Sequence, residues 1–246
     1  MDGNDKGVPV QALAAIILVC ALIAAAVMFL PGGGEKPAAI AATASDTAAG
    51  LGTEPPSRAE EILAGMTVEE KVGQMFFAGM PDGDAARIAA EDPLGGYVLL
   101  ARNFAGKTRE EAAEMIDGVR CAGGIPLFIG VDEEGGTVNR VSLNPELRGV
   151  PFWSPQDLYE EGGFELIRSD TQEKCELLSS LGINVNFAPV CDVSQDPDDF
   201  IYDRSFGRSA GETAEYAGLV VRTMSEEGMG SALKHFPGYG GNSDTH

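Results

Sequence analysis

The sequence predicts an α/β fold built around a parallel β-sheet. Short apolar runs alternate with longer stretches rich in Ala and Glu, which is the order of strands and helices in such folds. The apolar runs show no polar alternation, as expected for strands that are covered on both faces by helices. Polar residues follow several runs, where parallel sheets place their ligands. A (β/α)8 barrel and a doubly wound sheet both fit, although no G-x-G-x-x-G motif follows a strand.

Each element is predicted from its own pattern. Apolar runs predict strands at residues 72–77, 96–100, 126–131, 184–190 and 231–235, of which the first could equally close a helix. Helical spacing predicts helices over residues 108–120 and 212–227, with Thr108 and Gly211 or Glu212 near their starts. Residues 156–181 hold one or two further helices.

The N-terminal segment predicts a membrane span. Residues 12–30 are apolar throughout, and about 20 such residues match a hydrocarbon layer of about 30 Å. A cleaved signal peptide is the alternative, with Ala-Thr-Ala at residues 42–44 as a cleavage motif. That motif lies far beyond the apolar run, which is also longer than the about 7 to 15 residues of a signal peptide. We therefore expect residues 1–30 to form a cytoplasmic stub and a single-pass signal anchor in the cell membrane. The rest of the chain would be extracellular, or secreted if the segment is cleaved.

Composition divides the remaining chain into a linker and a domain. Residues 31–57 are rich in Pro, Gly and Ala and predict a flexible linker, so residues 58–246 form the folded domain. The chain carries 38 acidic and 17 basic residues, a net charge of -21, which excludes nucleic acid as a partner because phosphates would be repelled. The 4 Cys show no metal-ligand spacing and are expected to be small buried residues.

Polar residues stand directly after most of the predicted strands. These clusters are Ala101-Arg102-Asn103, Asp132-Glu133-Glu134, Cys191-Asp192 and Lys234-His235. Because the carboxyl ends of parallel strands meet at one side of the sheet, we expect the clusters to converge there and to form a ligand site.

Both histidines lie within residues 234–246, where a strand leads into a Pro/Gly-rich loop that ends in Asp244-Thr245-His246. In an extended loop the Asp244 carboxylate can reach the His246 imidazole, fix its tautomer and stabilise the imidazolium. This pairing predicts general acid/base chemistry. A surface capping contact is the structural alternative. A metal site of His235, Asp244 and His246 is less favoured, since no E-x-x-H helix or second His pair accompanies it.

Several ordered blocks resemble the N-terminal barrel of glycoside hydrolase family 3. They are MTVEEKVGQMFFAG (66–79), LGGYVLLARN (94–103), IPLFIGVDEEGGTVNRV (125–141), NVNFAPVCDV (184–193), DRSFGRS (203–209) and KHFPGYGGNSDTH (234–246). The Asp-x-His loop is most similar to the β-N-acetylhexosaminidase branch, typified by bacterial N-acetylglucosaminidases of peptidoglycan turnover. The resemblance implies an incomplete (β/α)8 TIM-type barrel with about five of the eight strands, preceded by the transmembrane helix.

The resemblance also implies which residues bind the substrate. Asp132 would bind sugar hydroxyls, and Arg140 would contact the ligand from the same loop. Arg204, Lys234 and His235 would hold the hydroxyls of N-acetylglucosamine. Charged groups on rigid strand ends suit this task, because charge-assisted hydrogen bonds can clamp a polyhydroxylated ring. A buried ion-pair network at the barrel mouth is the structural alternative for Asp132, Arg204 and Lys234.

The same resemblance implies that His246 is the general acid/base and that Asp244 orients it. The loop departs from the better-known members, because Tyr239 replaces a second His and the segment before Asp244 is one residue shorter. The family nucleophile is an Asp on a later strand, and no Asp of this chain matches its motif. We therefore expect the nucleophile to lie beyond His246 and this chain alone to be inactive.

Together these features predict a retaining glycoside hydrolase that removes terminal β-linked N-acetylhexosamine from peptidoglycan-type glycans. No cofactor and no metal are expected. The partners would be an N-acetylglucosamine-containing glycan and, through the N-terminal helix, the membrane. One alternative is a β-glucosidase or xylosidase of the same family, against which the Asp-x-His loop argues. The other is a non-catalytic, anchored sugar-binding domain.

Residues 58–246 expressed alone are expected to be unstable or to aggregate. An open barrel leaves a sheet edge and apolar surface uncovered, and both promote association. Size-exclusion chromatography and thermal unfolding measure this behaviour. Monodisperse elution together with a cooperative transition would contradict the expectation.

Overall fold

The computed structural model describes residues 57–239, 241 and 242, which belong to one unit spanning Pro55–His246. Its elements are α2 (Arg58–Gly65), α3 (Val68–Gly73), β1 (Phe77–Gly79), α4 (Ala85–Glu91), β2 (Gly96–Leu99), α5 (Ala101–Phe104), α6 (Arg109–Arg120), β3 (Phe128–Val131), α7 (Pro155–Ser180), β4 (Val185–Asn186), η1 (Tyr202–Arg204), α8 (Ala210–Glu226) and β5 (Gly230–Ser231).

The predicted membrane span over residues 12–30 lies outside the described residues, as does the linker up to residue 56. In the part of the chain that the structure describes, no helix combines the length and the apolar character needed to cross a bilayer.

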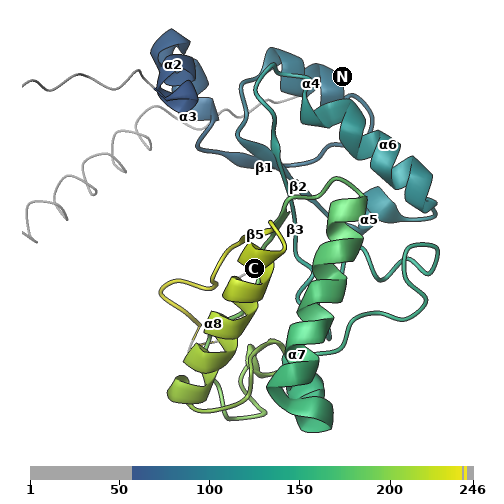
Figure 1. Cartoon of the computed structure of the whole chain (residues 1–246), viewed down its shortest axis with the longest axis vertical. Coiled ribbons are helices and arrows are strands. Elements are labelled where there is room, and N and C mark those ends of the chain that lie inside the picture. Colours follow the sequence, from purple (N-terminus) through teal and green to yellow (C-terminus); the bar gives the residue numbers. More distant parts are fainter. Residues whose placement is uncertain (1–56, 240, 243–246) are drawn as a thin grey trace, which may run out of the picture. The chain divides into compact units, whose positions relative to one another are not determined.

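The strands form one parallel sheet in the order β1-β2-β3-β4-β5 (Figure 1). Every neighbouring pair is parallel, and the register places Tyr97 beside both Ala78 and Ile129. A doubly wound sheet reverses its strand order at a switch point, whereas this sheet winds in one direction. The α/β class and the parallel sheet are therefore confirmed, and the sequential order is that of a TIM-barrel-like wall.

The prediction of a strand at residues 72–77 is wrong for most of that run. Thr67 and Glu70 form a capping box that starts α3, so the chain is helical until Gly73, and β1 begins only at Phe77. The alternative prediction, that this run closes a helix, is confirmed for Val72 and Gly73, which end α3.

Two other strands are shorter than predicted. The run 184–190 pairs as a strand only over Val185–Asn186, because the backbone N–H of Ala188 turns back to the carbonyl oxygen of Asn186 at 2.8 Å instead of continuing the ladder. The strand predicted at 231–235 begins one residue earlier and spans only Gly230–Ser231, and Val190 then pairs with Lys234 in an isolated parallel bridge.

The predicted helices are confirmed, with small shifts at their ends. Thr108 caps α6 through the backbone N–H of Glu111, and Ser209 caps α8 through that of Glu212. Residues 156–181 form α7, which is broken at Gly163, where φ is 62°. Helices α2, α4 and α5 are not predicted by the sequence pattern.

Helices cover one face of the sheet. Tyr97 and Ile129 are buried in a core that includes Ile116 of α6, and Figure 1 shows α4 beside α6 and α7 beside α8. The opposite face carries Phe77 and Phe128, whose ring centroids lie 5.9 Å apart and which remain 40% and 56% exposed. The expectation that helices cover both faces is thus wrong for these strands, because in a TIM-barrel-like wall the helices lie outside and side chains fill the inner face.

The cysteines differ from one another in burial. Cys175 is buried as predicted, and burial raises the pKa of its thiol to about 11. Cys191 is half-buried, whereas Cys121 is exposed because it lies at the C-terminal cap of α6. Cys20 lies outside the described residues.

Candidate functional site

Charged side chains from three loops converge at the carboxyl ends of the later strands. Asp132 follows β3, Arg204 ends η1, and Lys234 and His235 follow β5. The structure therefore brings together four of the five residues predicted to bind the sugar, which are far apart in the sequence.

Glu134 joins the two cations of this cluster. Its carboxylate accepts from Arg204 Nη2 at 2.9 Å and from Arg204 Nε at 3.0 Å, and it also forms an ion pair with Lys234. Lys234 Nζ lies 2.7 Å from Asp132 Oδ1 as well. The Glu134 side chain is only 4% exposed, so it is a buried anion balanced by two cations. Glu134 lies in the polar run after the predicted strand at 126–131, but its sequence position alone did not predict this role.

The pKa of Arg204 reflects this environment. Burial acts to lower the pKa, but the hydrogen bonds and the negative charge of Glu134 outweigh burial, and the pKa is raised. Arg204 is therefore a permanent donor in the cluster.

Asp192 holds the loop that follows β5. Its Oδ2 accepts from the backbone N–H of His235 at 3.0 Å and lies 2.7 Å from His235 Nδ1, while its Oδ1 accepts from the Tyr239 N–H at 2.6 Å. Burial acts to raise the pKa of Asp192, but these hydrogen bonds outweigh burial and hold the pKa below its ordinary value of 3.8. This role of Asp192 was not predicted, although its position at the end of a predicted strand is a signal that could have indicated it.

His235 lies between Asp192 and Arg204. Its Nε2 is 3.2 Å from Arg204 Nη2, and its ring meets the Tyr239 ring edge-on with centroids 4.9 Å apart. The side chains of His235 and Asp132 are 27% and 24% exposed, so both can reach a ligand. The cluster offers donors and acceptors side by side, which is what hydroxyl groups require.

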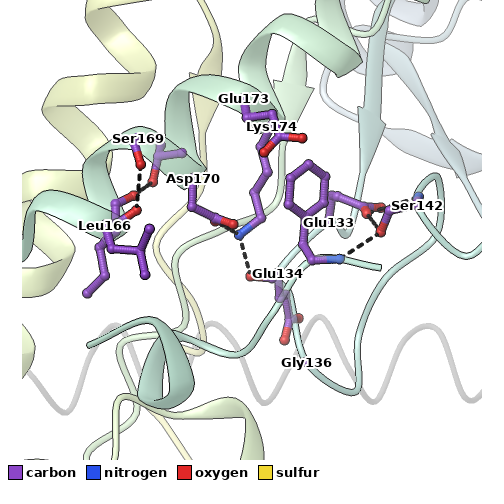
Figure 2. Close-up of polar contacts among 12 residues, drawn as sticks. Glu133, Glu134, Gly136, Ser142, Leu166, Ser169, Asp170, Glu173 and Lys174 are labelled. Atoms are coloured by element: carbon purple, nitrogen blue, oxygen red, sulfur yellow. Dashed lines mark hydrogen bonds and ion pairs between the residues drawn. The ribbon is translucent and has the colours of Figure 1, made fainter. Parts of the chain in front are cut away.

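The Glu133 carboxylate fixes the loop behind the site. It accepts from the backbone N–H groups of Arg140 and Val141 at 2.7 Å each and from that of Ser142 at 3.1 Å. It also accepts from the Ser142 hydroxyl, as Figure 2 shows. Because Glu133 is fully buried, these donors are needed to offset its desolvation.

A buried ion pair on α7 supports the same loop. Lys174 Nζ donates to the carbonyl oxygen of Glu134 at 3.2 Å and to Asp170 Oδ2 at 2.5 Å (Figure 2). Lys174 therefore holds the backbone of Glu134, whereas Arg204 and Lys234 hold its carboxylate.

Two sets of residues that were predicted to join the site, Arg140 and the run 101–103, do not lie in the cluster. The Arg140 guanidinium donates to the carbonyl oxygen of Asn139 at 3.2 Å, within its own loop. The cluster Ala101-Arg102-Asn103 does not converge with the others, because it forms α5, in which Asn103 accepts from the Leu100 N–H and Arg102 donates to the Met80 carbonyl.

The predicted dyad of Asp244 and His246 lies outside the described residues. Among the residues that are described, no group of three or more His, Cys, Asp or Glu side chains could hold a metal ion.

Asp192 is expected to stabilise the fold at neutral pH and to lose this effect in acid. Because its folded-state pKa lies below 3.8, its contribution is complete above that pH and is lost as the pH falls through the lower folded value. Asp192→Asn should therefore lower the free energy of unfolding at about pH 7 and have a smaller effect in acid. Urea unfolding across this pH range measures it, and an effect that is equal at all pH values would contradict the expectation.

Comparison with protein families matches residues 67–246 to the glycosyl hydrolase family 3 N terminal domain. The chain is 32% identical over 188 residues to beta-hexosaminidase LpqI of Mycobacterium tuberculosis, covering 75% of this chain and 47% of that protein. It is 33% identical over 165 residues to a beta-hexosaminidase of Idiomarina loihiensis, covering 65% and 48%.

A solved structure is also similar, that of a glycoside hydrolase family 3 beta-N-acetylglucosaminidase from Paenibacillus sp. The TM-score is 0.65 at 32% identity, and the match covers 74% of this chain and 35% of that one. The chain spans about half the length of the curated relatives it matches. Since the family match extends over most of its length, the chain belongs to glycosyl hydrolase family 3, whose N-terminal domain it carries.

Proposed function

We propose that the protein is a retaining glycoside hydrolase that removes terminal β-linked N-acetylhexosamine from peptidoglycan-type glycans. The observation that carries the proposal is the convergence of Asp132, Arg204, Lys234 and His235 at the carboxyl side of the sheet. The names of the relatives, beta-hexosaminidase and beta-N-acetylglucosaminidase, support the choice of sugar.

In this proposal the cluster recognises the hydroxyl groups of the sugar. Arg204 and Lys234 donate charge-assisted hydrogen bonds, and Asp132 accepts one from a hydroxyl. The ion pairs with Glu134 hold both cations in place before the ligand arrives. Binding therefore needs little reorganisation, which favours a precise position for the glycosidic bond.

We also propose that His246, oriented by Asp244, is the general acid/base. His246 would first protonate the glycosidic oxygen while a carboxylate nucleophile attacks the anomeric carbon, and the bond to the leaving group breaks. In the second step His246 would take a proton from a water molecule, whose oxygen displaces the enzyme carboxylate.

We assign no nucleophile among the carboxylates of the cluster. Asp132 and Glu134 are held by cations, and Asp192 is buried and accepts three hydrogen bonds. Each of these contacts stabilises the carboxylate and makes it a weaker nucleophile.

Assays of the full-length gene product test the proposed activity. An aryl β-N-acetylglucosaminide should be cleaved with a higher kcat/KM than the matching β-glucoside or β-xyloside. His246→Ala should lower kcat by about 100-fold or more, because general acid/base catalysis typically contributes that much.

Arg208→Ala is the matched control for this assay. Arg208 lies in the same block as Arg204, but its guanidinium stacks over the Tyr159 ring, 4.3 Å from the centroid, rather than in the cluster. A preference for glucosides, or a wild-type rate in His246→Ala, would argue against the assignment.

We further propose that residues 12–30 anchor the protein in the cell membrane with the catalytic domain outside. Their unbroken apolar character supports this placement. The intact chain should fractionate with membranes, and Leu18→Arg together with Ile23→Arg should release it, because each charge costs about 2.5 to 3.5 kcal/mol at a helix centre. Gln11→Arg, at the edge of the run, is the control. Intact wild-type protein in the soluble fraction would refute the anchor.

A further inference from the structure

The contacts of His235 determine which of its ring nitrogens carries the proton. A guanidinium can only donate hydrogen bonds, so His235 Nε2, 3.2 Å from Arg204 Nη2, must accept. An ionised carboxylate can only accept, so His235 Nδ1, 2.7 Å from Asp192 Oδ2, must donate. A neutral ring that is protonated at Nδ1 satisfies both contacts.

The other two states of the ring fit poorly. The Nε2–H tautomer would direct its N–H at the Arg204 donor and its Nδ1 lone pair at the Asp192 carboxylate, so both contacts would be repulsive. An imidazolium would satisfy Asp192 but would place a second positive charge beside Arg204.

We propose that Asp192 is a positioning residue of the sugar site, which fixes His235 in the Nδ1–H tautomer and thereby makes Nε2 a hydrogen-bond acceptor. This role rests on the proposed function, because it assigns what His235 presents to the sugar. A hydroxyl group carries one donor and two acceptor positions. It can therefore take the place of the direct contact between His235 and Arg204, donating to His235 Nε2 while it accepts from the Arg204 N–H that this exchange releases.

The geometry around Asp192 suits this role. The carboxylate is fully buried, and it holds both the ring of His235 and the backbone N–H of the same residue. Both the proton on Nδ1 and the orientation of the ring thus depend on one side chain. Within the described ranges, no other carboxylate makes a hydrogen bond to the His235 ring.

The first test is spectroscopic and requires no ligand. In the ¹⁵N-labelled full chain at about pH 8, above the ordinary histidine pKa of about 6.5, the His235 signals should show a protonated Nδ1 and an unprotonated Nε2. His235→Gln assigns these signals. A predominant Nε2–H tautomer would overturn the proposal.

The second test asks whether Asp192 acts through His235. Binding of N-acetylglucosamine to the full chain is measured by calorimetry for Asp192→Ala, His235→Ala and the double variant. Asp192→Ala should weaken binding about tenfold, the usual value of a hydrogen bond to a charged group. The double variant should bind no more weakly than His235→Ala alone. If the fold-loss of affinity in the double variant equals the product of the two single losses, Asp192 acts independently of His235 and only supports the loop, which would overturn the proposal.

Asp196→Ala is the matched control, since its carboxylate caps the backbone N–H of Asp198 at 3.0 Å in the loop that follows Asp192. It should bind the sugar as wild type does. If Asp192→Ala fails to fold, Asp192→Asn replaces it in the same cycle. Asp192→Asn should weaken sugar binding less than tenfold, and it should cause no further weakening in the His235→Ala background. If the wild-type chain binds no N-acetylglucosamine, the proposed sugar site fails, whereas the tautomer measurement still decides the role of Asp192.

Discussion

The arrangement of the site depends on one buried anion, the carboxylate of Glu134. A carboxylate that is removed from water must be compensated by nearby cations or donors. Arg204 and Lys234 supply that compensation from two other loops, and Arg204 lies 70 residues further along the chain. The loops after β3 and β5 and the segment at η1 are thus tied together by electrostatic pairing as well as by the sheet. The cations that would contact a sugar are the same ones that balance this buried charge.

Neighbouring acidic residues in the loop that carries Glu134 have different partners. Asp132 and Glu134 face the cations, whereas Glu133 between them accepts hydrogen bonds from the following turn. Such alternation is expected where an extended chain continues beyond a strand. Lys174 then holds the Glu134 carbonyl from α7. Glu134 is consequently held at its backbone by Lys174 and at its carboxylate by Arg204 and Lys234.

Much of this arrangement could be predicted from the sequence, for reasons that are local. Capping residues such as Thr108 and apolar runs specify helices and strands, and parallel strands bring their carboxyl ends together. This topology is why Asp132 and Lys234 could be expected to meet. The partner of each charged group could not be predicted. Glu134 pairs with Arg204 and Lys234, and Asp192 pairs with His235, only because of how the loops pack in the folded chain. Arg140 shows the converse, since its nearness to Asp132 in sequence does not bring its side chain into the cluster.

The division of charge within the cluster is compatible with the proposal that so acidic a chain holds a site for a neutral sugar. Asp132 and Glu134 are matched by Arg204 and Lys234, so these four charges offset one another. The remaining carboxylate, Asp192, is satisfied by N–H groups instead of by a cation. The side chains of Arg204 and Lys234 are 17% and 15% exposed, so a limited part of each cation is open to a ligand. A site balanced in this way exerts little long-range attraction, so its selectivity must come from the placement of donors and acceptors. If His235 carries its proton on Nδ1 as we propose, that proton contributes to this placement as much as the charges do.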